Sequence, residues 1–348
     1  MRILVTGANG LIGSKIVEVF TSEGFKTRSF VRVSSDLSLI KNLKSEIFYG
    51  DIFERTPLFN AAEGCDLIVH TVADFVYTDS RADQIFEKAK AGVTNVFLAA
   101  RSAGIKRVVL TSSSVIFGYS HEPKLCNEGK VGTIGTSQYE AMKIHQEKIA
   151  DVLANENGIE LVKVCPTMTV GAYASEIGPS NRFIAAYLND QLALSYVGGC
   201  NVVSSMDVAK AHLIAALHGT SGESYIAGSE NLTWVDVHST ISELCGLSNP
   251  RFVLGRKSFL MGTLLEMAKA EINQQESRTT LEEAQMIGRY YWYSSVKLAE
   301  LGYKPDPSRI ALAVAISHLV KRPDVIPRET RRRIRLHRDV QALRRLMK

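Results

Sequence analysis

Short runs of apolar, β-branched residues recur along the first half of the chain, each followed by a stretch with helix-like spacing. These runs alternate little between apolar and polar residues, which is typical of strands covered on both faces. Strand–helix–strand units connect through right-handed crossovers. The pattern therefore predicts an α/β fold with a Rossmann-type doubly wound parallel sheet. The strand candidates are Ile3–Thr6, Thr27–Val31, Glu46–Tyr49, Leu67–Thr71, Val108–Ser112 and Leu161–Cys165.

Two of the intervening segments carry clear helix signals. Ile12, Ile16 and Phe20 recur at helical spacing after the first strand. A later helix is expected to begin with the capping box Ser137–Glu140 and to end near Gly158.

Beyond about residue 168 the pattern loosens and helical segments dominate. Val202–Val203 and Glu223–Ala227 are expected as strands that return to the main sheet. The expected organisation is a first domain over residues 1–168 with returning segments near 200–228, a smaller, mostly helical, interleaved C-terminal domain over 169–320, and a basic tail over 321–348. Helices are expected over Pro179–Asn189, Trp234–Cys245, Ser258–Ala270 and Thr279–Ile287, the last with a capping box from Thr279 to Glu282.

The chain has 348 residues and a formal net charge of +5, and that charge is unevenly distributed. Residues 321–348 hold eleven Lys or Arg against three acids, so the preceding 320 residues carry −3. A nucleic-acid partner is therefore not expected. Over residues 328–348, apolar side chains fall on one helical face among arginines, which suits a peripheral contact with an anionic membrane, packing on a subunit such as the second copy of a homodimer, or a solvated extension. That face consists of Leu336, Val340, Leu343 and Met347.

The five cysteines form no C-x-x-C pair and show no metal-ligand spacing, so we expect reduced, mostly buried thiols and no metal site. No apolar run approaches the roughly 20 residues of a membrane-spanning helix. A strand-like segment, rather than a charged-then-apolar signal, opens the sequence, and we expect a cytoplasmic protein. The cysteines are Cys65, Cys126, Cys165, Cys200 and Cys245.

A glycine-rich turn connects the first strand to the first helix. In Thr6-Gly7-Ala8-Asn9-Gly10-Leu11-Ile12-Gly13, the first glycine permits a tight turn and the second lets the backbone approach a pyrophosphate. The third allows close packing of helix and strand, and the helix N-terminus faces the phosphates. Three glycines can also simply build a turn, but their place between strand and helix favours a dinucleotide site. The expected cofactor contacts here are Gly7, Asn9, Gly10, Leu11, Ile12 and Gly13.

The residues after the second strand indicate which dinucleotide is bound. A carboxylate there accepts hydrogen bonds from the ribose 2′-hydroxyl, whereas a cation accommodates a 2′-phosphate. Here Arg32 follows the strand and no acid occurs before Asp36. NADP is therefore preferred, and NAD is possible. Asp51 and Ile52, after the third strand, are expected at the adenine edge.

Tyr139 and Lys143 share one face of the capped helix. A tyrosine has an ordinary pKa of about 10, so acid–base work near neutrality calls for a nearby cation, which Lys143 supplies. Ser113, after the fifth strand, is placed to hold a substrate oxygen. With the glycine turn, the combination predicts a catalytic site.

On these segments the chain resembles an extended short-chain dehydrogenase/reductase over roughly residues 1–320. Within that superfamily it is similar to the bacterial dihydroflavonol-reductase-like and hopanoid-associated sugar-epimerase-like group. Further segments that carry the resemblance are Val31–Arg32, Ser35–Leu37, His70–Asp74, Pro166–Gly171, Gly228–Thr233, Ser294–Lys297 and Leu301–Pro305.

The resemblance implies roles for these residues. Tyr139 would donate a proton to a carbonyl oxygen or remove one from an alcohol, Lys143 would lower the pKa of that phenol and bond the nicotinamide ribose, and Ser113 would steady the reacting oxygen. It also implies cofactor-lining positions at Val72, Ala73, Pro166 and Thr167.

Departures from the family pattern narrow the chemistry. Ser114 and Val115 stand where sugar-nucleotide dehydratases carry Asp-Glu, which disfavours dehydration. Cys165 stands where many nucleotide-sugar enzymes have asparagine, a pattern closer to the ketone reductases. Ala89 replaces an asparagine usual in relatives, so any relay that this asparagine provides is in doubt.

The expected function is an NADP(H)-dependent oxidoreductase that reduces a ketone or aldehyde of a small molecule, or oxidises a secondary alcohol. One alternative is an NAD-dependent (nucleotide-)sugar epimerase, which returns the hydride to its substrate. Another is a non-catalytic dinucleotide sensor or scaffold, although such proteins typically lose the pair that Tyr139 and Lys143 form here.

Overall fold

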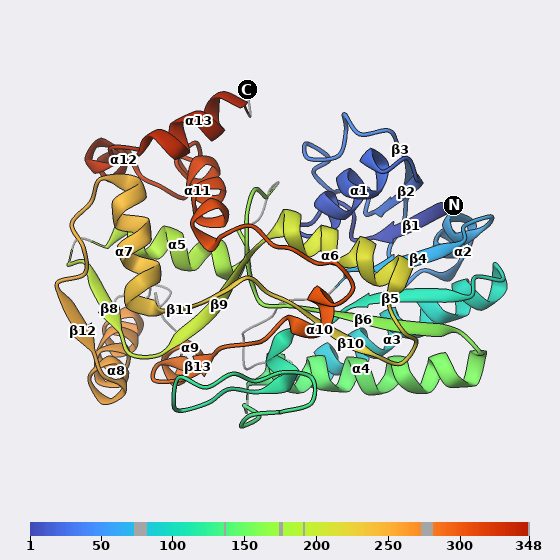
Figure 1. Ribbon diagram of the computed structural model, residues 1–348, viewed down its shortest axis with the longest axis horizontal. Coiled ribbons are helices and arrows are strands. Elements are labelled where there is room, and N and C mark those ends of the chain that lie inside the picture. Colours follow the sequence, from blue (N-terminus) through green and yellow to red (C-terminus); the bar gives the residue numbers. More distant parts are fainter. Residues whose placement is uncertain (73–81, 136, 174–176, 191, 273–280, 347–348) are drawn as a thin grey trace.

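The computed structural model describes the chain except residues 73–81, 136, 174–176, 191, 273–280 and 347–348. A seven-stranded parallel sheet in the order β10-β6-β5-β4-β1-β2-β3 forms its larger part (Figure 1). This confirms the doubly wound parallel sheet, and each of the six strand candidates matches an observed strand to within one residue at either end. The strands are β1 (Arg2–Thr6), β2 (Lys26–Val31), β3 (Ser45–Tyr49), β4 (Leu67–His70), β5 (Arg107–Thr111), β6 (Glu160–Pro166) and β10 (Ser224–Ala227).

Helices cover both faces of this sheet, which explains why its central strands are rich in apolar residues on both faces. In β1, Ile3 and Val5 pack into one core and Leu4 into another on the opposite face, and all three are fully buried. The first core lies under α1 (Gly13–Ser22) and α6 (Ser205–His218). The second lies under α2 (Arg55–Ala62), α3 (Ala82–Ser102) and α4 (Gln138–Asn157).

The predicted capping box fixes where α4 begins. The Ser137 hydroxyl accepts a hydrogen bond from the Glu140 backbone N–H at 3.1 Å, and the Glu140 carboxylate accepts one from the Ser137 N–H at 3.3 Å. The helix ends at Gly158, whose φ of +62° places it in the left-handed region that favours glycine. Tyr139 consequently lies in the first turn of α4.

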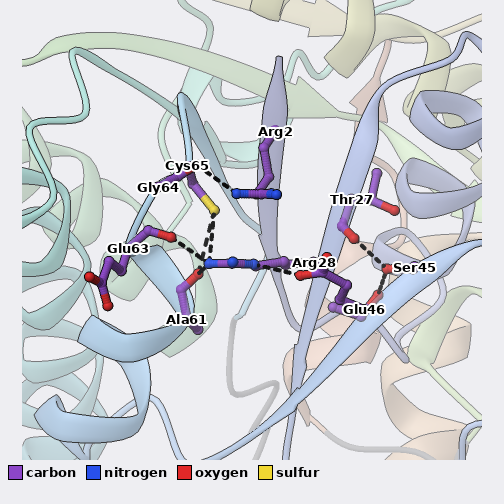
Figure 2. A network of polar contacts seen from close by, with 10 residues as sticks. Arg2, Thr27, Arg28, Ser45, Glu46, Ala61, Glu63, Gly64 and Cys65 are labelled. Carbon is purple, nitrogen blue, oxygen red and sulfur yellow. Dashed lines mark hydrogen bonds and ion pairs between the residues drawn. The ribbon is translucent and has the colours of Figure 1, made fainter.

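Arg28 on β2 joins three elements at the N-terminal edge of the sheet (Figure 2). Its guanidinium donates to the carbonyl oxygens of Ala61 and Glu63 at the end of α2, and to the Glu46 carboxylate on β3 at 2.9 Å. It therefore supplies hydrogen-bond donors to carbonyl groups at a helix C-terminus, where the last carbonyls have no partner within the helix. This network is structural and lies at the sheet edge opposite the strand ends that carry the expected site.

A second part of the molecule is built around a small sheet of β11, β9 and β13, with β7 also paired to β9. The expectation that Val202–Val203 returns to the main sheet is therefore wrong, because β9 pairs antiparallel with β11 and parallel with β7. An apolar, β-branched run indicates a buried strand but does not specify its partner. Only the second returning segment, now β10, joins the main sheet, beside β6. The remaining strands are β7 (Met168–Val170), β8 (Leu194–Tyr196), β9 (Gly199–Ser204), β11 (Glu230–Thr233), β12 (Phe252–Leu254) and β13 (Tyr290–Tyr291).

Helices make up most of the rest of this second part. The predicted helix boundaries hold at both ends of α5 and α7, and α8 extends two residues beyond its prediction at each end. The capping box proposed for Thr279 to Glu282 lies outside the described residues and side chains. The helices are α5 (Pro179–Asn189), α7 (Trp234–Cys245), α8 (Arg256–Ile272), α9 (Leu281–Met286), α10 (Val296–Ala299), α11 (Ser308–Leu319), α12 (Arg328–Arg333) and α13 (Arg338–Leu346), with a short 3₁₀ helix, η2 (Ser114–Phe117), after β5.

The basic tail packs on this second part. Val340 is fully buried in the core that contains α7 and α11, and Leu336 packs against it. Backbone N–H groups of Arg335 and His337 donate to the carbonyls of Cys245 and Leu244 at the end of α7, at 2.7 and 2.9 Å. The described part of the tail's apolar face is thus covered by the chain itself, while Arg331–Arg333 remain exposed. Met347 and the side chain of Leu343 lie outside the description.

All five cysteines are buried and free, as expected. Among the described residues, no helix is both long enough and apolar enough to cross a membrane. Within the same part of the chain, His, Cys, Asp and Glu side chains form no group of three or more that could hold a metal ion.

Candidate active site

The loops that carry the expected site meet at one edge of the main sheet. β1 and β4 are adjacent and parallel, and the chain continues from β1 toward one side of the sheet and from β4 toward the other. In doubly wound sheets the crevice at this switch point, beyond the carboxyl ends of the strands, is where ligands bind. The glycine turn follows β1, Ser113 follows β5, and Pro166 ends β6. The topology thus brings these segments to one edge.

The glycine turn has the geometry that its sequence predicts. Gly7 has a φ of +70° and donates its N–H to the Phe30 carbonyl at 3.2 Å. A Cβ at Gly13 would lie 2.1 Å from the carbonyl oxygen of Gly7, and one at Gly10 would lie 3.3 Å from the same oxygen. Only a residue without a Cβ fits at Gly13, where the first turn of α1 packs against the loop.

The N-terminus of α1 suits an anionic ligand. Ile12 occupies the N-cap position and offers no side-chain cap, so the first backbone N–H groups have no side-chain acceptor there. Asn9 is half-buried, Gly10 is exposed, and Leu11 packs against the second part of the molecule. The positive end of the helix dipole and the absence of a side-chain cap fit a pyrophosphate. These residues therefore fit a dinucleotide cofactor.

Around this turn, the loop after β4 contributes Val72, whose side chain lies near Gly7. A Cβ built on Gly7 would lie 3.1 Å from Val72 Cγ2. Val72 is partly exposed and is thus available to a ligand at the turn. Ala73, also expected to line the cofactor, lies outside the described residues.

A cationic side chain follows the carboxyl end of β2. Arg32 is exposed and directly follows the last residue of β2. Asp36, the first acid after that strand, faces its own loop, where its carboxylate accepts a hydrogen bond from the Ser38 N–H at 2.8 Å. This bond lowers the pKa of Asp36. The nearest carboxylate in sequence is thus engaged locally.

The expected adenine edge is also ordered by local contacts. The Asp51 carboxylate accepts a hydrogen bond from the Phe53 N–H at 3.0 Å. Ile52 is buried, and its carbonyl accepts a hydrogen bond from the Asn95 side-chain amide at 3.1 Å. The loop after β3 is therefore fixed to α3.

Ser113, Tyr139 and Lys143 form the candidate catalytic group. The Tyr139 phenol is hydrogen-bonded to the Ser113 side chain. Ser113 is 6% exposed and Lys143 is 2% exposed. The structure thus brings the phenol and the serine hydroxyl together, with the lysine one turn further along α4.

The pKa of the Tyr139 phenol differs from the expectation. Burial raises the pKa of Tyr139 to about 12, although its hydrogen bond with Ser113 acts in the opposite direction. Burial also lowers the pKa of Lys143 to about 8. The expected lowering of the phenol's pKa by Lys143 is therefore not what the structure gives, because removal of the phenolate from water is the larger effect.

Pro166 and Thr167 lie at the end of β6, as expected. Pro166 is buried, and the Thr167 hydroxyl donates to the side-chain oxygen of Asn201 at 2.8 Å. The same oxygen accepts a hydrogen bond from the Ser229 N–H. The side chain of Thr167 is thus part of a buried amide network with β9.

Gln146 is a site residue that the sequence analysis missed. Lys143 Nζ donates to the side-chain oxygen of Gln146 at 3.1 Å and to the backbone oxygen of Thr111 at 3.2 Å. Gln146 is 2% exposed. The available signal was its position three residues after Lys143, which puts both side chains on one face of α4.

A dinucleotide-binding fold with a tyrosine, a lysine and a serine at its switch point defines a class of enzymes that act with NAD(P). The family model "NAD dependent epimerase/dehydratase family" matches residues 3–228. The chain belongs to this family, within the extended short-chain dehydrogenases/reductases, and is an NAD(P)-dependent enzyme.

Similar proteins include a putative reductase among the curated relatives, and the fold is shared with an epimerase of known structure. The chain is 28% identical over 311 residues to "Sterol demethylase protein B" of Methylococcus capsulatus, covering 89% of this chain and 91% of the relative. It is 25% identical over 320 residues to "Putative dihydroflavonol 4-reductase" of Synechocystis sp., covering 90% and 92%. Among solved structures, "Crystal structure of gox2253" has a TM-score of 0.79 at 28% identity, covering 92% and 98%. A UDP-glucose 4-epimerase of Thermus thermophilus in complex with NAD shares the fold, with a TM-score of 0.70 at 21% identity, covering 91% and 98%.

Proposed function

We propose that the protein is an NADP(H)-dependent reductase of a ketone or aldehyde. The observation that carries the proposal is the hydrogen-bonded pair of Tyr139 and Ser113, with Lys143 one turn along the same helix, at the sheet edge where the glycine turn lies. A hydroxyl pair can hold a carbonyl oxygen and deliver a proton to it.

The protonation state of Tyr139 suits the role of a proton donor. With a pKa of about 12, the phenol stays neutral across the physiological range and is ready to donate a proton. Oxidation of an alcohol would need the phenolate, which burial disfavours. These properties support Tyr139 as the proton donor to a carbonyl oxygen, while substrate and nucleotide concentrations set the direction of net turnover.

In this mechanism Ser113 donates a hydrogen bond to the substrate carbonyl oxygen, and Tyr139 transfers its proton to that oxygen as negative charge develops there. When bound, reduced NADP supplies the hydride that the carbonyl carbon accepts. Lys143, with a pKa of about 8, can then return a proton toward the phenolate. The glycine turn and the N-terminus of α1 hold the pyrophosphate.

The preference for NADP rests on Arg32. Its exposed guanidinium follows β2 directly, while Asp36 is engaged with Ser38. A cation at this place favours a 2′-phosphate. We expect Arg32→Ala to weaken NADPH binding by about 10- to 100-fold, the equivalent of one charged hydrogen bond, and to leave NADH binding nearly unchanged. The matched control is Lys41→Ala, at an exposed lysine in the same loop region.

Two relatives guide the choice of substrates. The names of the sterol demethylase protein and the putative dihydroflavonol reductase both refer to rigid polycyclic compounds. We therefore propose a polycyclic ketone as the substrate class. Ser114, buried where a dehydratase would carry an acid, supports reduction rather than dehydration.

The test is NADPH oxidation by the purified protein with a panel of steroid, flavanonol and simple ketones. We expect turnover that Tyr139→Phe reduces by about 10²–10⁴. No turnover with any ketone under either nucleotide would refute the proposal. NAD that copurifies with the protein and cycles without net consumption would instead identify an epimerase. If Tyr139→Phe fully replaced the wild-type protein in the cell, the protein would be identified as a non-catalytic dinucleotide sensor.

A further inference from the structure

Lys143 is a buried ammonium group whose partners are neutral. Its Nζ donates to the backbone oxygen of Thr111, at the last residue of β5, and to the side-chain oxygen of Gln146. Within the described residues no carboxylate forms an ion pair with it. A buried charge without a counter-ion depends on its hydrogen bonds.

Two of the titratable groups that face Lys143, His70 and Cys165, carry no negative charge at neutral pH. His70, from β4, is buried and hydrogen-bonded to Thr6, and burial lowers its pKa to about 3, so it is neutral. Cys165, from β6, stays a thiol because burial raises its pKa well above the ordinary value.

Glu147, four residues after Lys143 on α4, is a carboxyl group whose charge raises the pKa of Lys143, against the larger effect of burial, but its hydrogen bond is made with another residue. The Cys165 thiol donates to Glu147 Oε1 at 3.8 Å. Burial raises the pKa of Glu147, against the influence of Lys163 and Lys143. Lys163 itself pairs with Asp151 at 2.8 Å. The acceptors that hold Lys143 are thus an amide oxygen and a backbone oxygen.

We propose that Gln146 is a positioning residue for Lys143, holding the ammonium at the end of β5 through an acceptor that brings no counter-charge. Any residue at position 111 would offer Lys143 a backbone oxygen. The second acceptor, the amide oxygen, depends on the identity of residue 146. Only the kinetic consequence of this proposal rests on the proposed function, in which Lys143 returns a proton to the Tyr139 phenolate.

The neutral amide of Gln146 affects how readily Lys143 gives up its proton. A carboxylate in place of the amide would stabilise the ammonium form and make Lys143 a poorer proton donor. An apolar side chain would remove one of its two acceptors and favour the neutral amine. A neutral amide keeps the lysine charged at pH 7 while allowing it to lose its proton near pH 8. Gln146 would thereby set the pH range in which Tyr139 is reprotonated.

The test measures the protonation of Lys143 directly. Protein labelled with [13Cε]lysine is titrated by NMR as wild type, Gln146→Glu and Gln146→Met, and the Lys143 resonance is identified by its loss in Lys143→Met. We expect a midpoint near 8 in wild type. It should rise by about one unit in Gln146→Glu and fall by about half a unit in Gln146→Met, which has similar length but no acceptor oxygen. Ala141→Glu, which adds a charge at an exposed position of α4, should move it by no more than about 0.3 units.

Kinetics then separates this role from a purely structural one. The alkaline limb of kcat/KM for ketone reduction should shift in the same direction as each NMR midpoint, with the KM for NADPH nearly constant. Unchanged midpoints in both folded position-146 variants would overturn the proposal. Shifted midpoints in a protein that reduces no ketone would uphold the role of Gln146 and refute the proposed function, so the two failures are distinguishable.

Discussion

Replacing Lys143 by methionine should remove a specific pH dependence of stability. Burial lowers the pKa of Lys143 from 10.5 to about 8. Between these values the unfolded chain binds more protons than the folded protein, so the free energy of unfolding of wild type rises with pH. Below pH 8 the full cost of burying the ammonium is present, and above pH 10.5 it disappears. Lys143→Met has no ionisable group at this position, so its free energy of unfolding lacks this pH dependence.

The magnitude follows from the shift. A difference of about 2.5 pKa units corresponds to a destabilisation of about 3 kcal/mol at pH 7, of which about 1.4 kcal/mol remains at pH 9.5. The stability of wild type relative to Lys143→Met should therefore rise by about 2 kcal/mol between these two pH values. The substitution also leaves the acceptors on Thr111 and Gln146 without their donor, which costs about 1–3 kcal/mol. That cost does not depend on the charge of Lys143 and largely cancels when the two pH values are compared.

The assay is urea unfolding of both proteins at pH 7 and pH 9.5. Lys148→Met, at an exposed lysine on the same helix, serves as the control and should show nearly no pH-dependent difference from wild type. A difference between wild type and Lys143→Met that stays constant across the two pH values would show that burial does not depress the lysine's pKa, and the reasoning about its proton would fail.

Other substitutions test the remaining parts of the molecule. Gly13→Ala, whose Cβ would meet the Gly7 carbonyl, should destabilise the protein by about 1–3 kcal/mol and abolish nucleotide binding, measured by thermal melts and fluorescence titration. Gly262→Ala, within α8 and with nothing near its Cβ, should instead stabilise it by about 0.5–1 kcal/mol, and equal effects at both positions would contradict the packing argument. Tyr139→Phe should reduce kcat by about 10²–10⁴ while NADPH binding persists, and a smaller loss would remove the phenol from proton transfer. Val340→Ala should cost about 1–2 kcal/mol in urea unfolding, and no measurable cost would mean that the tail's contact with α7 and α11 is weak.

The main sheet was predictable because its signals are local. The first six strands are short runs rich in apolar residues, and the capping box before Tyr139 and the left-handed glycine after α4 act within one turn of the helix. The positions of Ser113, Tyr139 and Lys143 at one sheet edge followed from the rule that parallel strands share a carboxyl edge. These features depend on residues close in sequence or on topology that the pattern already implied.

Features that depend on long-range partners were not predictable in the same way. The pairing of Val202–Val203 with β11 and β7 is decided by tertiary contacts, not by the run itself. The pKa of Tyr139 depends on how deeply the phenol is buried, and burial outweighs the hydrogen bond with Ser113, which acts in the opposite direction. In the sequence, Gln146 does not differ from other polar residues of the helix, because its role depends on the hydrogen bond that Lys143 Nζ donates to it in the structure.

The contact between the tail and α7 bears on the order in which the chain acquires its structure during synthesis. The last carbonyls of α7 accept hydrogen bonds from Arg335 and His337, which leave the ribosome long after the helix itself. The main sheet, by contrast, is complete once β10 has emerged. The core beneath α1 and α6 also needs Leu298 and Tyr303, which leave the ribosome after α7 but before Arg335 and His337. Because domains fold as units during translation, the nucleotide-binding half should be folded and able to bind its ligand once these two residues have emerged, while α7 still awaits its final partners. A ligand present at that stage would stabilise the nascent first half before the second is finished.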